Sequence, residues 1–526
     1  MGRAYDACVQ TTLTALDDGK LRDRTVGWIV TISITLMAFA LRFYNIGFPH
    51  KVLFDETYYA KDGWAIMQSG YERNWADGAN DLLLKGDLSG MEDTAAFVVH
   101  PPLGKILIGL GETMFGMNPF GWRFMALIFG TLLVFLTIRL ARRVSRSTLI
   151  GAVAGLLLTF DGLAFVMSRL ALLDIFQATL AVAAIAALVA DRDWFRHRLG
   201  QHLRKNNLDD LGGQFGPLML LRPWRIAAGV LFGLSCAVKW NSIYVLAVFG
   251  IVTVVWDLGA RQLAGARHRK WLSLVIDAPA AFVQLVVVAV PVYIATWWGW
   301  LSTSGGYSRD WGEGNPDHPL VKFFGKALGS LMWYHHQAYE FHTSDKMMTE
   351  TTHTYQSHPA SWILMLRPIG IEAENDIQPG TQGCEAVGDT CMRIISGMGT
   401  PVLWWAAALA LLAGLYWWII KRDWRFAVPV LALGAAWLPW FQYADRPIFF
   451  FYAIMMIPFS SIALAMAIGK ILGPPEHPKR RVRAIVAGLI VALVIVNFAY
   501  LYPVLTAELV SRSSWWARMW LGNTWV

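Results

Sequence analysis

Long apolar stretches separated by short polar connections dominate the pattern along the chain. A helix needs roughly 20 apolar residues to cross the hydrocarbon of a membrane, and about 17 suffice at the lower limit. By this measure the pattern predicts about eleven membrane-spanning helices and an all-α, polytopic membrane fold. The predicted spans are 26–43, 123–140, 147–165, 170–190, 224–239, 242–258, 272–298, 400–420, 426–442, 448–470 and 484–506.

The basic residues of the connections fall in alternate gaps between these spans, which predicts the orientation of the chain. Short loops rich in Lys and Arg stay on the cytoplasmic side of a membrane. Counting through the spans puts every basic cluster on one side, whereas one missed helix would put half of them on the wrong face. We therefore expect a cytoplasmic N-terminus. The clusters lie at 20–24, 139–146, 192–225, 261–270, 421–425 and 470–483.

The charge pattern also decides how two ambiguous apolar segments are interpreted. In 224–258, two runs of about 16 residues are each short for a crossing, but Arg225 and Arg261 need an even number of crossings between them. The segment 100–116 begins with two prolines and carries Lys105. Counting it as a span would invert every later basic cluster, so we expect an interfacial helix on the outer surface.

Composition agrees with a membrane protein and excludes several other classes. Of the 526 residues, 56% are hydrophobic and only 16% are charged, which argues against a soluble enzyme or a disordered chain. The 26 Trp residues suit interfacial aromatic belts. The net charge of +8 is spread over predicted cytoplasmic loops, which argues against a nucleic-acid partner. The first apolar run has no small-residue cleavage site, so we expect it to be an anchor.

Two long outer loops, 44–122 and 299–399, divide the chain. We expect a cytoplasmic segment (1–25), an N-terminal membrane module containing the first loop (26–298), the large loop (299–399), C-terminal helices (400–506) and an extracytoplasmic tail (507–526). Chemistry usually sits on long loops held by a rigid scaffold. No period of 20–50 residues repeats, which argues against a solenoid or an inverted-repeat transporter.

Two adjacent carboxylates, Asp55 and Glu56, follow the first span and open a predicted short helix. For an arbitrary Asp-Glu pair, the simpler interpretation is that Asp55 caps the helix while Glu56 lies near its positive end. The position of this pair at the membrane surface, beside many aromatic residues, favours chemistry instead.

Five basic residues map to the same outer side of the membrane. Each alone is more typical of an anchor that reaches the interface, or of a partner for a carboxylate such as Asp161, Asp174 or Asp445. Together they indicate an anionic ligand at the outer leaflet. The five are Lys105, Arg123, Arg169, Lys239 and Arg446.

A carboxylate pair near cations at a lipid interface suits group transfer from a phospholipid-linked donor. The leaving phosphate needs its charge neutralised, which Arg or Lys does. An incoming hydroxyl needs a carboxylate to accept its proton. One base and one cationic pocket would suffice, without a metal or another cofactor.

The second long loop is rich in His and aromatic residues. His335, Glu340 and His342 have no spacing typical of a closed metal site, so we expect these residues to be satisfied polar groups or contacts to sugar and peptide. Cys384 and Cys391 lie on the predicted oxidising side, which favours a disulfide over free thiols.

These motifs, in this order and over most of the chain, resemble the protein O-mannosyltransferases. They are Asp55-Glu56, His100-Pro101-Pro102-Leu103-Gly104-Lys105, Arg123 with Gly130, the segment from Ser168-Arg169 to Asp174, Lys239-Trp240-Asn241, and Arg446 before Phe449-Phe450-Phe451-Tyr452.

The resemblance implies a GT-C membrane glycosyltransferase that moves mannose from a polyprenyl phosphate to Ser or Thr hydroxyls of translocating proteins, with inversion. Asp55 would be the base and Glu56 its neighbour in site organisation, while Arg123 and Arg446 would face the donor phosphate or the acidic pair. The eukaryotic members carry a β-trefoil insertion, for which loop 299–399 has no room, so the chain resembles the bacterial, actinobacterial form. Further expected donor or substrate contacts are Tyr59, His100, Lys105, Arg169, Lys239, Asn241, His335 and His336.

The resemblance further implies a plasma-membrane enzyme that contacts membrane lipids and acts on acceptor polypeptides, with the Sec translocon as a candidate partner. Two rivals remain open. One is a related GT-C transferase with a cell-wall glycan or lipid acceptor. The other is a lipid or anion transporter, which would need polar residues deep within several spans, whereas the charges here gather at one face.

Overall fold

The computed structural model describes Leu16 and residues 23–526, so most of the predicted segment 1–25 lies outside the described residues. Within this part of the chain, eight helical segments are long and apolar enough to cross a membrane, and each coincides with a predicted span. The chain is a mostly helical, multi-span membrane protein, as predicted. The eight are α2 (Arg24–Phe43), α6 (Pro119–Ser145), α9 (Leu173–Lys205), α11 (Ser242–Leu263), the segment Arg267–Thr296 that contains α12 (Asp277–Phe282) and α13 (Val288–Thr296), α17 (Pro401–Ile419), the segment Trp424–Tyr443 that contains α18 (Ala427–Trp437), and α20 (Arg480–Leu505).

The three remaining predicted spans correspond to shorter helices, so the count of eleven crossings stays a prediction. They are α7 (Thr148–Thr159) followed by α8 (Gly162–Met167), α10 (Pro223–Cys236) and α19 (Ile457–Leu472). The break between α7 and α8 has a local cause. The Asp161 carboxylate caps α8 by accepting the Ala164 N–H at 2.8 Å, and it also accepts the Trp404 Nε1–H of α17 at 2.8 Å. One buried carboxylate thus ends a helix and ties it to a distant one.

The core of the bundle is α9, which packs against α6, α10 and α11. Most of its apolar window is buried inside the protein. A helix that is apolar all round is expected in the interior. Its N-terminal end carries Asp174, and the short 237–241 connection next to it carries Lys239.

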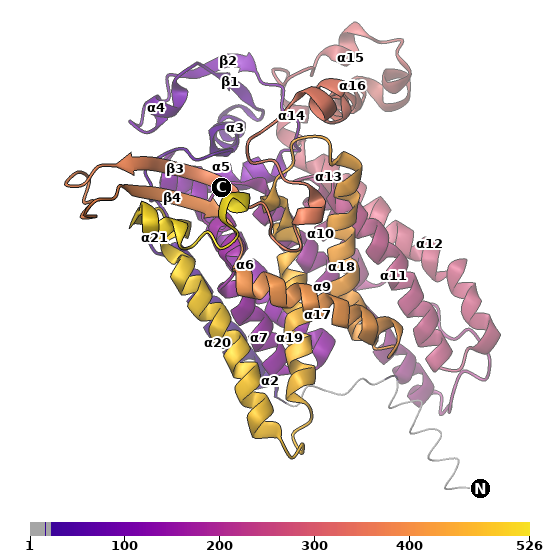
Figure 1. Ribbon diagram of the computed structural model, residues 1–526. Coiled ribbons are helices and arrows are strands. Elements are labelled where there is room, and N and C mark those ends of the chain that lie inside the picture. Colours follow the sequence, from indigo (N-terminus) through magenta and orange to yellow (C-terminus); the bar gives the residue numbers. More distant parts are fainter. Residues whose placement is uncertain (1–15, 17–22) are drawn as a thin grey trace.

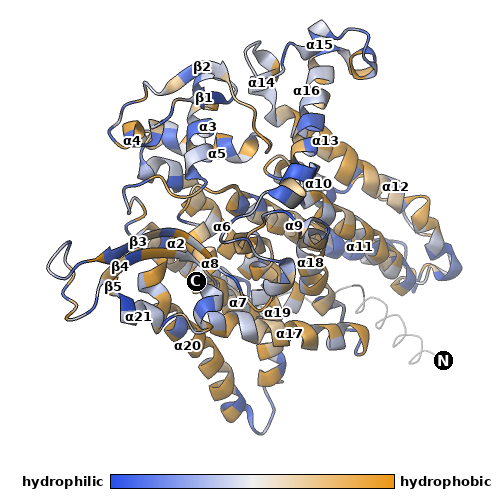
Figure 2. Ribbon diagram, turned by 45° about the horizontal axis from the view of Figure 1, so that its top comes forward, coloured by the Kyte–Doolittle hydropathy of each residue, from blue (hydrophilic) through white to orange (hydrophobic). Residues whose placement is uncertain are grey.

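The two long loops, far apart in sequence, fold together at one end of the bundle (Figure 1). The first contributes α3 (Glu56–Ser69), β1 (Arg73–Trp75), α4 (Ala79–Leu83), β2 (Met91–Ala95) and α5 (Leu103–Phe115). The second contributes α14 (Trp298–Ser302), α15 (Trp311–Gly314) and α16 (Pro319–Thr343). The helix predicted over 100–116 is thus present as α5. Figure 2 shows mostly hydrophobic residues along α12, α17 and α20, and more hydrophilic ones on this loop-bearing end.

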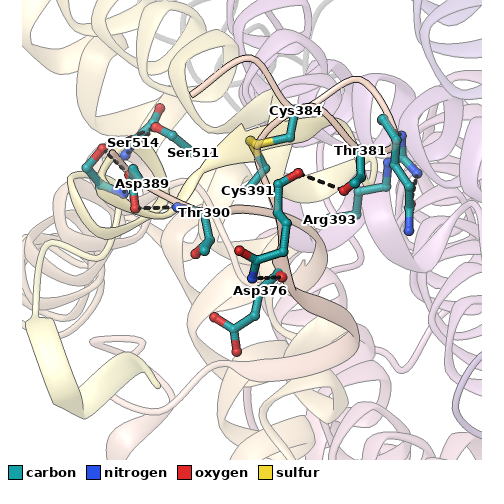
Figure 3. The surroundings of a disulfide bond; sticks show 12 residues. Asp376, Thr381, Cys384, Asp389, Thr390, Cys391, Arg393, Ser511 and Ser514 are labelled. Carbon is teal, nitrogen blue, oxygen red and sulfur yellow. Dashed lines mark hydrogen bonds between the residues drawn. A yellow bond between two sulfur atoms is a disulfide. The ribbon is translucent and has the colours of Figure 1, made fainter. Parts of the chain in front are cut away.

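The second loop also forms a sheet that the all-helical prediction did not contain. β3 (Ile369–Ile377), β4 (Cys391–Gly397) and β5 (Leu509–Ser511) pair antiparallel in that order. The predicted tail 507–526 is therefore an integral part of the fold, since it supplies β5 and α21 (Arg512–Trp516). Cys384 and Cys391 form a disulfide at the β3–β4 hairpin (Figure 3). The Asp389 carboxylate next to it accepts hydrogen bonds from the Ser513 N–H and hydroxyl.

At the end of the bundle opposite the loops, four charged side chains form a closed buried cluster. Arg222 donates to Asp191 at 2.6 Å and to Asp257 at 2.8 Å, and Arg225 donates to the same two carboxylates at 3.1 and 2.7 Å. All four are at most 1% exposed. Two positive and two negative charges cancel, and the cluster joins α9, α10 and α11.

We expect Arg222→Met to destabilise the bundle, because it leaves two buried carboxylates with one guanidinium. Removing one partner of a buried ion pair costs about 3–5 kcal/mol. Thermal unfolding of the detergent-solubilised protein should shift to lower temperature, while Arg204→Met, at an exposed position of α9, should not shift it. Equal unfolding temperatures for Arg222→Met and the wild type would contradict a stabilising role of the cluster.

Candidate active site

The two adjacent carboxylates at the start of α3 have different surroundings. Glu56 is fully buried. Its carboxylate accepts hydrogen bonds from Arg123 Nε at 2.8 Å and Nη2 at 2.9 Å, from the Leu53 N–H at 2.9 Å and from the Ala171 N–H at 3.1 Å. Asp55 is half-buried and makes no side-chain cap bond to α3. The capping interpretation of Asp55 is therefore wrong.

Two of the predicted outer cations, Arg123 and Arg169, hold the backbone of the first loop. Arg123 also donates to the carbonyls of Ile46, Pro49 and Lys51. Arg169 donates to three backbone carbonyls at and just after the end of α2, those of residues 42, 44 and 45. The structure thus places Arg123 against the acidic pair, and both arginines lie behind the site, bonded to the chain itself.

Asp55 lines a cavity of about 580 Å³ between α3, β1 and the extended segment 96–100. We call it the acidic cavity, since Asp55 and Asp62 line it together with Tyr59, His100 and Lys105. Burial raises the pKa of Asp55 to about 6; Lys239 and the Tyr59 hydroxyl oppose this rise, and Asp174 adds to it. Lys105 is itself bonded to Glu72 and to the His100 carbonyl.

A second cavity of about 230 Å³ adjoins the first, because His100 lines both. We call it the cationic cavity, after Lys239 and Arg446, which line it together with Trp240, Asn241 and His342. Lys239 Nζ lies 2.8 Å from Asp174 and 4.8 Å from the centre of the Tyr452 ring. The Asn241 side-chain oxygen accepts a hydrogen bond from Gln177 at 2.5 Å. In the described part of the chain, Lys105, Arg123 and Arg169 lie outside the cationic cavity.

Arg446 is positioned by His342, a residue expected from the sequence to be a satisfied polar group or a contact to sugar and peptide. Arg446 Nη1 donates to His342 Nδ1 at 3.1 Å, and His342 Nε2–H donates to the Val99 carbonyl at 3.2 Å. Burial and the Arg446 charge lower the pKa of His342 to about 4, so the ring stays neutral and serves as acceptor and donor at once. Arg446 Nε is buried and has no hydrogen-bond partner among the described residues.

The two adjacent His residues of α16 point to different surroundings. The His335 ring stacks on Trp240 with 5.6 Å between ring centres, and its Nε2 accepts the Tyr293 hydroxyl at 2.6 Å. His335 thus supports one wall of the cationic cavity from behind. His336 is half-exposed and pairs with Glu340 at 3.3 Å, on the outer face of the helix. The structure does not bring His336 to the site.

An apolar groove of about 920 Å³ continues from the cationic cavity, and the two share Tyr244 and Pro439. Its walls come from α11, α17 and α18 and consist mainly of Leu, Val and Ala side chains. Because these helices belong to predicted spans, the groove lies where lipid chains would reach it. No group of three or more His, Cys, Asp or Glu residues suited to a metal ion occurs in the described ranges.

Both halves of the chain are similar in sequence to known proteins. Residues 32–199 match the model of the dolichyl-phosphate-mannose-protein mannosyltransferase family, and residues 330–525 match that of the C-terminal four-helix membrane region of protein O-mannosyltransferases. A polyprenol-phosphate-mannose–protein mannosyltransferase of Mycolicibacterium smegmatis is 38% identical, with 95% of this chain and 93% of the relative covered. The enzymes of that name from Mycobacterium tuberculosis (37%, covering 95% and 92%) and Corynebacterium glutamicum (33%, covering 89% and 88%) are also similar.

The fold of the chain is also similar to that of a solved protein O-mannosyltransferase. The protein O-mannosyltransferase complex Pmt1-Pmt2 of S. cerevisiae, solved with its sugar donor, superposes with a TM-score of 0.70 at 12% identity, covering 95% of this chain and 92% of the matched chain. Given this fold and relatives above 30% identity over nearly their whole length, the chain belongs to the protein O-mannosyltransferase family.

Proposed function

We propose that the chain transfers mannose from polyprenyl-phosphate-mannose to Ser or Thr hydroxyls of proteins, with inversion at the anomeric carbon. The observation that carries this proposal is the position of Asp55. It lines the acidic cavity, which shares His100 with a cationic cavity whose Lys239 acts on the Asp55 charge, and that cavity in turn adjoins an apolar groove. The acidic cavity suits the acceptor polypeptide, the cationic cavity suits the donor phosphate, and the apolar groove suits the polyprenyl chain.

The donor fits the cationic cavity and the apolar groove. A polyprenyl chain has the chemistry of the Leu- and Val-lined groove, and its phosphate needs the charge of Arg446 and Lys239. Lys239 already shares its charge with Asp174. Arg446 lines the same cavity and has no carboxylate partner among the described residues, so we assign it the main role in phosphate binding.

The reaction is a single displacement with Asp55 as general base. The acceptor oxygen attacks the anomeric carbon while its proton passes to an Asp55 carboxylate oxygen. The bond between that carbon and the phosphate oxygen breaks, and the polyprenyl phosphate leaves with the electron pair. Lys239 and Arg446 neutralise the charge that develops on the leaving phosphate. Glu56 and Arg123 act as positioning residues, since they fix the segment that carries Asp55.

The cellular setting follows from the charge pattern of the connections. We place the protein in the plasma membrane with a cytoplasmic N-terminus and an extracytoplasmic site, because the basic connections lie at the end opposite the two long loops. Acceptors would then be met as they leave the secretion machinery, with the Sec translocon as the proposed partner. The division into 26–298, 299–399 and 400–506 describes membrane module, outer loop and C-terminal helices in this scheme.

Asp55→Asn should reduce mannose transfer about 10³-fold while the protein stays inserted and folded, because the amide cannot accept the proton. The assay uses purified protein, polyprenyl-phosphate-mannose and a Thr-containing peptide. Asp81→Asn, at an exposed position of the same loop, serves as the control and should transfer at the normal rate. A normal rate for Asp55→Asn would exclude it as the base.

The raised pKa of Asp55 predicts the acidic limb of the pH profile. With a pKa of about 6, the base is increasingly protonated below that pH, so kcat/KM should fall about tenfold per pH unit there. Above pH 6 the carboxylate is charged and the rate should level off. Measuring kcat/KM between pH 4.5 and 8 in wild type tests this, and a rate that stays level down to pH 4.5 would exclude control by this carboxyl.

Arg446→Gln should weaken donor binding and lower transfer by about 100-fold, because a buried cation that faces a phosphate contributes several kcal/mol. Binding of polyprenyl phosphate and the KM for the donor are the measurements. Lys326→Gln, exposed on α16, removes an equal charge near the same loops and should change neither. Unaltered polyprenyl phosphate affinity in Arg446→Gln would mean that the phosphate binds elsewhere.

A further inference from the structure

A second carboxylate, Asp62, lines the acidic cavity and has no role in the proposed transfer step. Asp62 lies on α3, seven residues after Asp55, and is only 9% exposed. Among the described residues, no donor lies within hydrogen-bonding distance of its carboxylate. A buried carboxylate without a partner is costly to a fold and is usually explained by strain, a missing ligand or function.

The neighbours of Asp62 are already committed to other partners. Lys105 is fully buried and bonded to Glu72 and to the His100 carbonyl. Lys61 is the only other cation with a notable electrostatic effect on Asp62 in the described part of the chain. Burial raises the pKa of Asp62 to about 7, which Lys105 opposes and Glu72 reinforces. Burial and Asp62 raise the pKa of the third nearby carboxyl, Glu112, well above its usual range, which favours its neutral form. Asp62 and Glu72 then face two ammonium groups, so the surroundings favour a neutral hydrogen-bond donor over a further cation.

Helix geometry relates the two carboxylates. Seven residues of an α-helix make almost two full turns, so Asp55 and Asp62 share one face, with about 10 Å between their positions along the axis. The cavity extends along α3 from Asp55 to Asp62 and is also lined by Arg73–Trp75 of β1 and by residues 96–99. A space of this form suits an extended polypeptide, which advances about 3.3 Å per residue. About 10 Å therefore equals three residues of such a chain.

We propose that Asp62 forms a second subsite of the acidic cavity, which binds a neutral hydrogen-bond donor of the acceptor polypeptide three residues away from the hydroxyl that receives the sugar. This inference rests on the proposed function, since it takes the acidic cavity as the acceptor site. An amide or hydroxyl side chain at that position would fill the open hydrogen-bonding capacity of Asp62. The subsite would give the enzyme a positional preference beyond the acceptor hydroxyl itself.

The test uses peptides with one Thr in an Ala-rich background and one Gln placed at each position from −5 to +5. Gln offers an amide donor and cannot itself receive the sugar. With wild type, kcat/KM should be highest, by about tenfold, for Gln at −3 or at +3, as expected for one hydrogen bond to a charged acceptor. Asp62→Leu should lose this preference, so that the ratio of kcat/KM between Gln at the preferred position and Gln at the other positions falls to about one.

Asp81→Leu is the control, because Asp81 is an exposed carboxylate of the same loop that does not line the acidic cavity in the described structure. It should keep the preference. Asp62→Leu should unfold at the same temperature as wild type or higher, since it removes an unpartnered buried carboxylate. If Asp62→Leu unfolds at a lower temperature and keeps the preference for Gln, the role of Asp62 is only structural. A second variant covers the case in which Asp62→Leu fails to fold. Asp62→Asn keeps one accepting oxygen and should retain part of the preference.

The two proposals fail in different ways. If wild type transfers mannose to Thr peptides without any preference for the position of Gln, the subsite is wrong and the proposed function stands. The same holds if wild type shows the preference and Asp62→Leu shows it equally. If wild type transfers mannose to none of the Thr peptides, the proposed function is wrong and the subsite falls with it.

Discussion

The buried ion pair between Glu56 and Arg123 is the interaction on which the site depends. The Glu56 carboxylate accepts four hydrogen bonds, and Arg123 also bonds the carbonyls of Ile46, Pro49 and Lys51. A buried charge is tolerable only when its partners compensate the loss of water, and here they do so fully. The pair joins the first loop to α6 and, through the Ala171 N–H, to the start of α9. The backbone that presents Asp55 is therefore fixed from three sides.

The pair also explains how two adjacent carboxylates can have separate roles. Successive residues of a helix point about 100° apart, so Glu56 faces the interior while Asp55 faces the acidic cavity. Arg123 pairs with Glu56 and neutralises its charge. The remaining influences on Asp55 are burial, Lys239, Asp174 and Tyr59, which leave its pKa near 6. A base with that value is charged at neutral pH and still accepts a proton readily.

Sequence reasoning predicted the helices well because hydropathy and loop charge depend on local composition. It predicted Asp55, Lys239 and Arg446 on the outer side, but it gave Arg123 and Arg446 the same role and grouped Lys105, Arg169 and Lys239 together as further contacts. Arg123 and Arg169 differ from Arg446 through hydrogen bonds to backbone carbonyls, and backbone carbonyls leave no signal in the sequence. The three-stranded sheet could not be predicted either, because β4 pairs with β5 more than 100 residues later in the chain. His342 was named in the second loop, yet only the fold shows which guanidinium it contacts.

His342 shows how the two halves of the site are held together. Its ring bridges α16 to Val99, which lines the acidic cavity, and to Arg446, which lines the cationic cavity. Only the neutral ring with its proton on Nε2 satisfies both contacts, because a second N–H at Nδ1 would face a guanidinium donor. The guanidinium charge and burial both disfavour protonation, so the contacts and the protonation state support each other. A displacement reaction needs both reactants in place at the same moment. The neutral His342 ring contacts both Val99 in the wall of the acidic cavity and Arg446 in the cationic cavity. It therefore fixes the position of the two cavities relative to each other.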